Sequence, residues 1–194
     1  EIDAFLSTDR PSLLRLGTGE LSDSLAMESV FPLSQFLIPF FSEKRNGVLE
    51  LKTKSVNVSS LLDLPHRGKT IVSWSVNPPK MIEEEEKGTA PLEDRINAAR
   101  RCQESGYLLG FHFDPIIYYE GWERGYEKAI HQLFKPIDPG RVVWVSLGGL
   151  RYPPKLKAMA EERFPRTKVF LGESFPGRDG KFRYLKEIRV EIYR

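Results

Sequence analysis

Polar side chains follow several short apolar runs of this sequence, at the points where strands would end. These polar clusters are Gly17-Thr18-Gly19-Glu20, Lys52-Thr53-Lys54, Ser75-Val76-Asn77, His112-Phe113-Asp114 and Ser146-Leu147-Gly148-Gly149. In a barrel of parallel strands, the carboxyl ends of the strands meet at one mouth, where reactive groups gather. A lysine, an imidazole, carboxylates and hydroxyls at one mouth could hold a charged ligand or move a proton. The spacing therefore predicts one site built from several strand ends.

Strand-like and helix-like runs alternate along most of the chain, and these elements must position the polar clusters. The strand-like runs are Leu13–Gly17, Val48–Thr53, Thr70–Val76, Tyr107–Phe113, Arg141–Leu147 and Lys168–Leu171. The helix-like runs are Ser24–Lys44, Val58–Leu64, Pro78–Lys87, Thr89–Ser105, Gly121–Phe134 and Pro154–Arg163. Repeated strand–helix units with short links predict parallel strands with right-handed crossovers. Turn formers flanked by aromatic and charged residues predict a β-hairpin over Glu173–Arg194.

Alternation within the strands indicates what each face of the sheet does. Val72, Trp74 and Val76 share one face, while the intervening residues are polar. We expect helices to cover the apolar faces and the polar faces to line the concave side. Burying neutral polar groups without partners would cost roughly 1–3 kcal/mol each. The pattern therefore predicts an incomplete barrel of about six strands that holds water or a polar ligand, with a flat sheet open to solvent as the alternative.

Composition limits the class of protein. The 194 residues are 40% hydrophobic and 29% charged, with a net charge of +2, which excludes a disordered tail or a wholly basic nucleic-acid arm. No apolar run is long enough to predict a membrane span. The single cysteine, Cys102, lies on the apolar face of the helix predicted over Thr89–Ser105, so we expect a core residue and no internal disulfide. We expect a monomeric, cytoplasmic protein without a metal site of its own.

Several of these stretches resemble one enzyme family. The stretches that carry the resemblance are Leu16–Leu25, Leu51–Lys54, Ser73–Asn77, Gly110–Ile117 and Glu120–Trp122. Together they resemble the spore photoproduct lyase family of radical S-adenosylmethionine enzymes, from about Leu14 to Tyr184. The region between Asp114 and Trp122 is the most specific part.

The resemblance implies an α/β fold, with residues 1–171 as a partial (β/α)6, TIM-like barrel and residues 172–194 as a C-terminal β-hairpin. It implies a [4Fe–4S] cluster held by a CxxxCxxC motif after the first strand, and S-adenosylmethionine as a cofactor that yields a hydrogen-abstracting radical. In the spore lyases, this radical reverses a thymine dimer in DNA.

The resemblance also implies roles for individual residues. The cofactor-contacting positions are Gly17, Thr18, Gly19, Glu20, Ser22, Lys54, Ser75 and Asn77. Among them, Lys54 would pair with the methionine carboxylate. The hairpin residues Lys181, Arg183 and Tyr184 would contact DNA, through cations on phosphate and a stacked ring.

Two departures from the family pattern affect these expectations. The sequence has no CxxxCxxC motif, so we expect the motif to lie upstream of Glu1 and this chain alone to be inactive. Glu20 stands where the lyases carry a hydrogen-donating cysteine. A carboxylate cannot replace a thiol in that role, which argues against the usual repair route unless another donor substitutes.

Other interpretations of these residues stay open at this point. The chain could be a barrel enzyme that uses His112, Asp114 and Glu20 for acid–base chemistry on a phosphorylated small molecule. It could also be a nucleic-acid-binding domain without catalytic function. His112 could instead be a packed histidine, and two ligands are too few for His112 and Asp114 to form a metal site. The run Glu83–Glu86 is typical of a solvated helix face.

Overall fold

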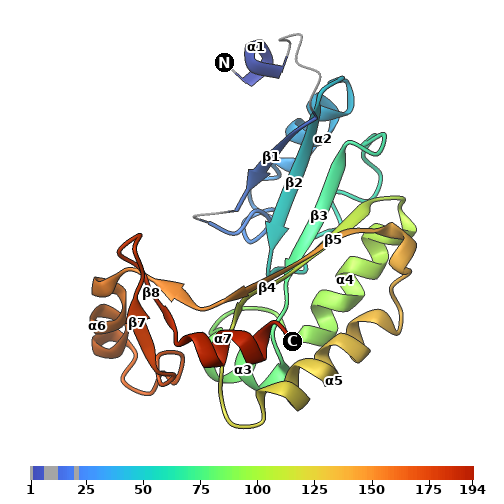
Figure 1. Cartoon of the computed structure of the whole chain (residues 1–194). Helices are drawn as coiled ribbons and strands as arrows, with labels where there is room; N and C mark the ends of the chain where they lie inside the picture. Colours follow the sequence, from blue (N-terminus) through green and yellow to red (C-terminus); the bar gives the residue numbers. More distant parts are fainter. Residues whose placement is uncertain (1, 7–12, 20–21) are drawn as a thin grey trace.

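The computed structural model describes residues 2–6, 13–19 and 22–194 (Figure 1). A parallel sheet dominates the described residues, and its strands lie side by side in chain order. The strands are β1 (Leu14–Thr18), β2 (Gly47–Thr53), β3 (Thr70–Ser75), β4 (Leu108–Ile116) and β5 (Val142–Gly149). The helices of this part are α1 (Ile2–Leu6), α2 (Ser34–Ser42), α3 (Pro79–Glu85), α4 (Leu92–Glu104) and α5 (Trp122–Phe134), and a short 3-10 turn covers Pro139–Arg141. The predicted α/β fold with parallel strands is confirmed.

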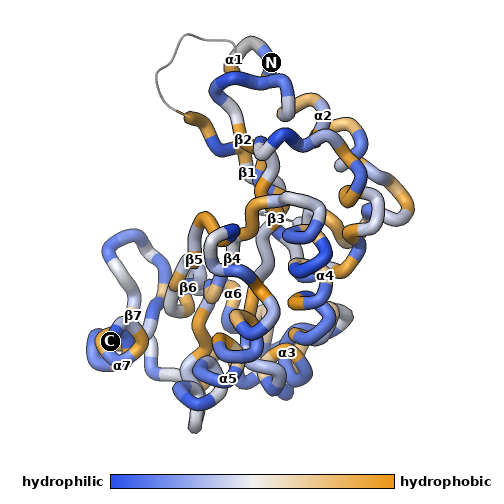
Figure 2. Tube along the Cα trace, turned by 90° about the vertical axis from the view of Figure 1, so that its right-hand side faces the viewer, coloured by the Kyte–Doolittle hydropathy of each residue, from blue (hydrophilic) through white to orange (hydrophobic). Residues whose placement is uncertain are grey.

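Helices α4 and α5 cover one face of the sheet. Phe111 packs edge-on against Phe134 with ring centroids 6.3 Å apart, and Phe113 meets Tyr126 at 6.2 Å. Figure 1 shows the two helices side by side on this face, and Figure 2 shows hydrophilic and hydrophobic residues alternating along α4. This periodicity matches the amphipathic helix predicted there. The opposite, concave face is left for the polar side chains.

A small antiparallel sheet follows the main one. It joins β6 (Arg151–Tyr152), β8 (Phe182–Tyr184) and β7 (Ser174–Pro176), in that spatial order. Helix α6 (Pro154–Arg163) lies beside it, and α7 (Lys186–Ile192) follows it (Figure 1). The rings of Tyr152 and Phe182 stack at 5.7 Å across neighbouring strands. The predicted C-terminal hairpin is therefore confirmed for its strand pair, although a helix and not a strand forms its last part.

Some of the predicted elements are wrong. The main sheet has five strands among the described residues instead of about six, because Lys168–Leu171 is a turn. In this turn the Lys168 backbone N–H donates to the Glu85 carboxylate at 2.8 Å and so makes no strand ladder. Val58–Leu64 is a series of turns, and the helix predicted from Ser24 begins only at Ser34. Residues 24–30 form bends and turns, and Pro32 separates them from the helix, since the residue before a proline avoids the helical conformation.

The apolar face of β5 is not covered as predicted. Val143, Val145 and Leu147 are exposed. The helix that follows β5 in the chain, α6, lies against the small sheet instead of returning over this face (Figure 1). Among the described residues, no helix has the length and apolar character needed to cross a membrane.

Candidate functional site

A cavity of about 190 Å³ lies at the carboxyl ends of β3 and β4. Four residues predicted from strand ends line it together: Lys54, Ser75, Asn77 and Asp114. The rest of its lining consists of Met81, Glu85, Glu86, Pro115, Ile117 and Val169. The structure thus brings three separate strand ends to one place, as parallel topology requires. We call this space the mouth cavity.

Glu86 is the centre of an ion-pair cluster at the mouth cavity. One of its oxygens lies 3.2 Å from Lys54 Nζ and accepts from Asn77 Nδ2 at 2.7 Å, and the other accepts from Arg95 Nη2 at 2.7 Å. Burial alone would raise the pKa of Glu86, but Lys54, Arg95 and Asn77 together hold it below its ordinary value. The prediction of a solvated helix face for Glu83–Glu86 is therefore wrong for Glu86, whose side chain is only 9% exposed.

Arg95 anchors this cluster from inside the protein. The arginine is 1% exposed, and it donates to the backbone carbonyl of Ser75 at 2.9 Å and to that of Ala90 at 2.8 Å. With Glu86 ionised, the two cations leave the cluster with a net charge of +1. Lys54 carries the outward part of this charge, because its side chain is 37% exposed. An anionic group of a ligand would be attracted to it.

The sequence contains a signal for Arg95 that our prediction did not use. Arg95 stands three residues after Leu92 and four before Ala99, on the apolar stripe of its helix. A charged residue on an apolar stripe needs a buried partner. Glu86 is that partner.

Asn77 has a fixed orientation in the cavity wall. Its Oδ1 accepts from the Tyr126 hydroxyl at 2.8 Å, while its Nδ2 donates to Glu86. The same hydroxyl accepts from the Ile117 backbone N–H at 2.9 Å, which ties the wall to the chain after β4. Burial raises the pKa of Tyr126, so the hydroxyl stays protonated and keeps donating. Both ends of the Asn77 amide are thus engaged inside the protein.

The loop after β1 is tied to the strand end that carries Lys54. Asp23 accepts from the Lys54 backbone N–H and from the Thr53 hydroxyl, each at 2.6 Å. Gly19 has a φ of 95°, and a Cβ there would lie 2.6 Å from the Lys52 carbonyl oxygen, so the turn requires glycine. Our sequence prediction missed Asp23, whose role depends on a contact with a distant strand.

The other residues near this loop that were predicted to contact the cofactor lie in different environments. Thr18 shares a hydrogen bond with Ser24 at 2.8 Å, and Gly17 is the register partner of Glu50 between β1 and β2. Ser22 is exposed, and it is not among the residues that line the mouth cavity. Glu20 lies outside the described residues.

A second set of polar side chains extends across the concave face of the sheet, deeper than the mouth cavity. His112 Nε2 lies 2.9 Å from Glu50 and Nδ1 lies 2.6 Å from the Ser146 hydroxyl. The Ser73 hydroxyl donates to Glu50 at 2.8 Å, and Arg15 lies 3.5 Å from its other oxygen. Burial would raise the pKa of Glu50, but the bonds from His112 and Ser73 and the charges of His112 and Arg15 hold it below its ordinary value. We call these side chains the polar row.

The two residues predicted to act as acid and base, His112 and Asp114, lie in different places. Asp114 lines the mouth cavity, whereas His112 does not, and both nitrogens of His112 are engaged by neighbours. Catalysis by either residue stays a prediction. The polar character expected for the concave face is present, and the buried groups of the polar row are hydrogen-bonded to one another.

A model of the spore photoproduct lyase family matches residues 1–189, nearly the whole chain. The chain belongs to this family. Among curated relatives, spore photoproduct lyase from Bacillus subtilis (strain 168) is 32% identical over 89% of this chain and 51% of its own length. The enzyme from Geobacillus sp. (strain Y412MC61) is 31% identical over 88% of this chain and 50% of its own. The chain thus spans about half the length of the curated relatives that it matches.

Solved structures of spore photoproduct lyase share this fold. A double mutant of spore photoproduct lyase with bound AdoMet and dinucleoside spore photoproduct superposes with a TM-score of 0.88 and 30% identity, over 99% of this chain and 59% of that one. A single mutant with dinucleoside spore photoproduct gives a TM-score of 0.87 and 29% identity, with the same coverage. The family resemblance and the partial barrel expected from the sequence are both confirmed.

The three hairpin residues of this chain that were predicted to contact DNA differ in how accessible they are to a ligand. Lys181 is exposed, while the Arg183 guanidinium donates to Asp179 in the same turn. Tyr184 is 1% exposed and its hydroxyl accepts from the Tyr118 backbone N–H at 3.0 Å. The prediction that Tyr184 stacks on a base is therefore wrong for this structure, because its ring is part of the core.

The cysteine content does not fit the iron–sulfur cluster that the family implies. Cys102 is the only cysteine of the sequence, and burial raises the pKa of its thiol to about 12. Such a thiol does not supply the thiolates that a cluster needs. The described residues also contain no group of three or more His, Cys, Asp or Glu side chains arranged to hold a metal ion.

Proposed function

We propose that this chain forms the S-adenosylmethionine-binding face of a radical enzyme of the spore photoproduct lyase type that acts on DNA. The observation that carries the proposal is the mouth cavity, where Lys54 presents a cation beside Ser75 and Asp114. Family membership over residues 1–189 supports it. A structural relative with bound AdoMet gives further support.

The residues of the mouth cavity fit the amino-acid end of S-adenosylmethionine. Lys54 would bind the methionine carboxylate, and the Ser75 hydroxyl would offer a neutral hydrogen bond. Glu86 and Arg95 would keep Lys54 in place, and Asp114 could receive the ammonium group. When bound, S-adenosylmethionine supplies the hydrogen-abstracting chemistry of this class of enzyme.

The cluster thiolates would come from residues outside this sequence, because Cys102 does not fit as a ligand. We therefore expect this chain alone to bind the cofactor weakly and not to cleave it. Glu20 stands at the position of the usual hydrogen donor, so the proposed enzyme would need another donor to complete repair.

The proposal is tested by titrating the chain with S-adenosylmethionine in a calorimeter. A hydrogen bond to a charged group contributes about 1.5–3 kcal/mol, so Lys54→Ala should weaken binding by roughly 10- to 100-fold. The matched control is Lys128→Ala, which removes an exposed lysine from α5. Equal affinity for wild type and Lys54→Ala, or no binding at all, would contradict the proposal.

A further inference from the structure

A larger groove begins beside the mouth cavity. Its volume is about 920 Å³, and it shares two lining residues, Glu85 and Val169, with the mouth cavity. One wall is the end of α3 and the residues just after it. The other wall is the segment from Ala160 to Phe170, which contains the end of α6. We call this space the flanking groove.

One wall of the flanking groove, from Ala160 to Phe170, lies in the basic part of an otherwise acidic chain. Residues 151–194 contain twelve Lys and Arg against six Asp and Glu, a net charge of +6. Residues 1–150 contain seventeen Lys and Arg against twenty-one Asp and Glu, a net charge of −4. The small overall charge therefore conceals a basic region that starts where the main sheet ends, and a basic region attracts polyanions.

The cations of the groove are freer than its anions. Arg163 and Arg166 are exposed and have no ion-pair partner in the part of the chain that the structure describes. The Glu85 carboxylate accepts from the Thr167 hydroxyl at 2.7 Å and from the Lys168 backbone, and Glu84 pairs with the Lys168 side chain at 3.2 Å. The carboxylates on the α3 wall are thus largely satisfied by the opposite wall, whereas the two guanidiniums are available to a ligand.

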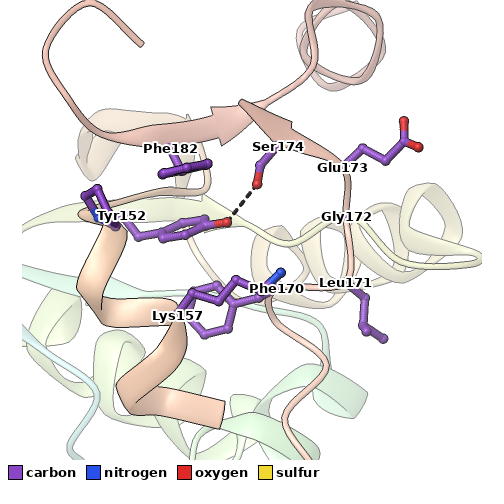
Figure 3. Close-up of a pocket in the computed structure, with 9 residues that line it drawn as sticks. Tyr152, Lys157, Phe170, Leu171, Gly172, Glu173, Ser174 and Phe182 are labelled. Atoms are coloured by element: carbon purple, nitrogen blue, oxygen red, sulfur yellow. Dashed lines mark hydrogen bonds between the residues drawn. The ribbon is translucent and has the colours of Figure 1, made fainter. Parts of the chain in front are cut away.

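The flanking groove also offers an aromatic face. Phe164 lines it and is 57% exposed, between the two arginines in sequence. A neighbouring cavity of about 300 Å³ shares Phe170 with the groove but offers no such face (Figure 3). There the Tyr152 ring is buried and stacked on Phe182, and its hydroxyl is bonded to Ser174 at 2.7 Å.

We propose that the flanking groove holds a single strand of DNA that passes beside the mouth cavity, with Arg163 and Arg166 on its phosphates and Phe164 against a base. Arginine suits phosphate because its fork of donors matches two phosphate oxygens. A basic groove with an aromatic side chain is the arrangement by which proteins bind single strands without reading sequence. The inference rests on the proposed function, since it places the DNA substrate beside the cofactor that the mouth cavity would bind.

The test measures the affinity of the chain for a labelled oligothymidylate of roughly a dozen nucleotides, a length that a single-strand groove can cover, by fluorescence anisotropy over a salt series. The double variant Arg163→Ser/Arg166→Ser should bind about tenfold more weakly at low salt. Its slope of log affinity against log salt should be shallower by about 1.4, because two phosphate contacts are lost. Phe164→Ala should weaken binding without changing the slope, because stacking releases no counterions.

The matched control is Arg124→Ser/Lys128→Ser, which removes the same charge from exposed positions of α5. It should keep the wild-type slope. An equal loss of DNA affinity in this control would show that DNA is attracted to the overall charge of the protein, and it would refute the proposed site in the groove. The proposed DNA site would also be refuted if the wild type did not bind DNA. It would be refuted as well if the two arginine substitutions weakened binding of an acidic peptide but not of DNA.

Different results would refute the DNA site in the groove and the cofactor site of the proposed function. The arginine double variant should bind S-adenosylmethionine like the wild type. Loss of DNA affinity in that variant, together with no effect of Lys54→Ala on the cofactor, would leave the groove standing and refute the cofactor site. The reverse pattern would refute only the groove.

Discussion

Two buried carboxylates of this protein have similar surroundings and different consequences. Glu50 in the polar row and Glu86 at the mouth cavity are each hydrogen-bonded, each close to a cation, and each have a lowered pKa. The polar row uses both nitrogens of His112 internally. Glu86 instead holds a lysine, Lys54, that is partly exposed beside a cavity. Position relative to the mouth cavity, more than residue type, therefore separates a group that holds the sheet together from one that prepares a binding site.

Loss of Arg95 should have the largest effect on stability. Arg95→Met keeps much of the side-chain volume but leaves Glu86 without its buried partner, which should lower the free energy of unfolding by about 3–5 kcal/mol. Urea denaturation measures this change. Arg100→Met on the exposed side of the same helix is the control and should change stability by no more than about 0.5 kcal/mol. Equal effects for the two variants would mean that Glu86 does not depend on Arg95.

Glu50→Gln should affect stability without affecting the cofactor. The substitution removes the charge that faces His112 and Arg15, and we expect a loss of about 1–3 kcal/mol in the free energy of unfolding. The affinity for S-adenosylmethionine should stay at the wild-type level, because the polar row does not line the mouth cavity. A tenfold loss of affinity would erase the distinction between the two carboxylates.

The two carboxylates should also make the stability of the protein depend on pH in the acid range. A carboxyl with a lowered pKa in the folded state stabilises the protein fully above its unfolded pKa, and this stability is lost as the pH falls through the folded value. The free energy of unfolding should therefore decrease as the pH is lowered below 4.5, the ordinary pKa of glutamate. The variant Glu50→Gln/Glu86→Gln should show a flatter decline in urea midpoints measured between about pH 5 and 3. An unchanged decline would assign the acid sensitivity to other groups.

Much of this arrangement could be predicted from the sequence because it follows from strand geometry. Alternating residues indicated the polar concave face, and parallel strands had to bring Lys54, Ser75 and Asp114 to one mouth. The partners of these residues could not be predicted in the same way. Asp23 and Glu86 act through contacts with distant segments, which no local pattern specifies.

The mistaken predictions have the same origin. Lys168–Leu171 has the composition of a strand, but Glu85 takes its backbone N–H and holds it as a turn. Tyr184 alternates with charged residues as an exposed ring would, yet it packs against Tyr118 from another part of the chain. Tertiary contacts override local pattern in both cases. Arg95 is the exception, since a charge on an apolar helix stripe is visible in the sequence.

The central claim is that the mouth cavity binds the cofactor while the polar row supports the sheet. The most direct test titrates S-adenosylmethionine into Lys54→Ala and Glu50→Gln side by side, with the stability of each variant measured in urea. We predict that Lys54→Ala binds roughly 10- to 100-fold more weakly and stays within about 1 kcal/mol of wild-type stability, while Glu50→Gln is destabilised and binds normally. Normal binding by Lys54→Ala together with weakened binding by Glu50→Gln would contradict the account.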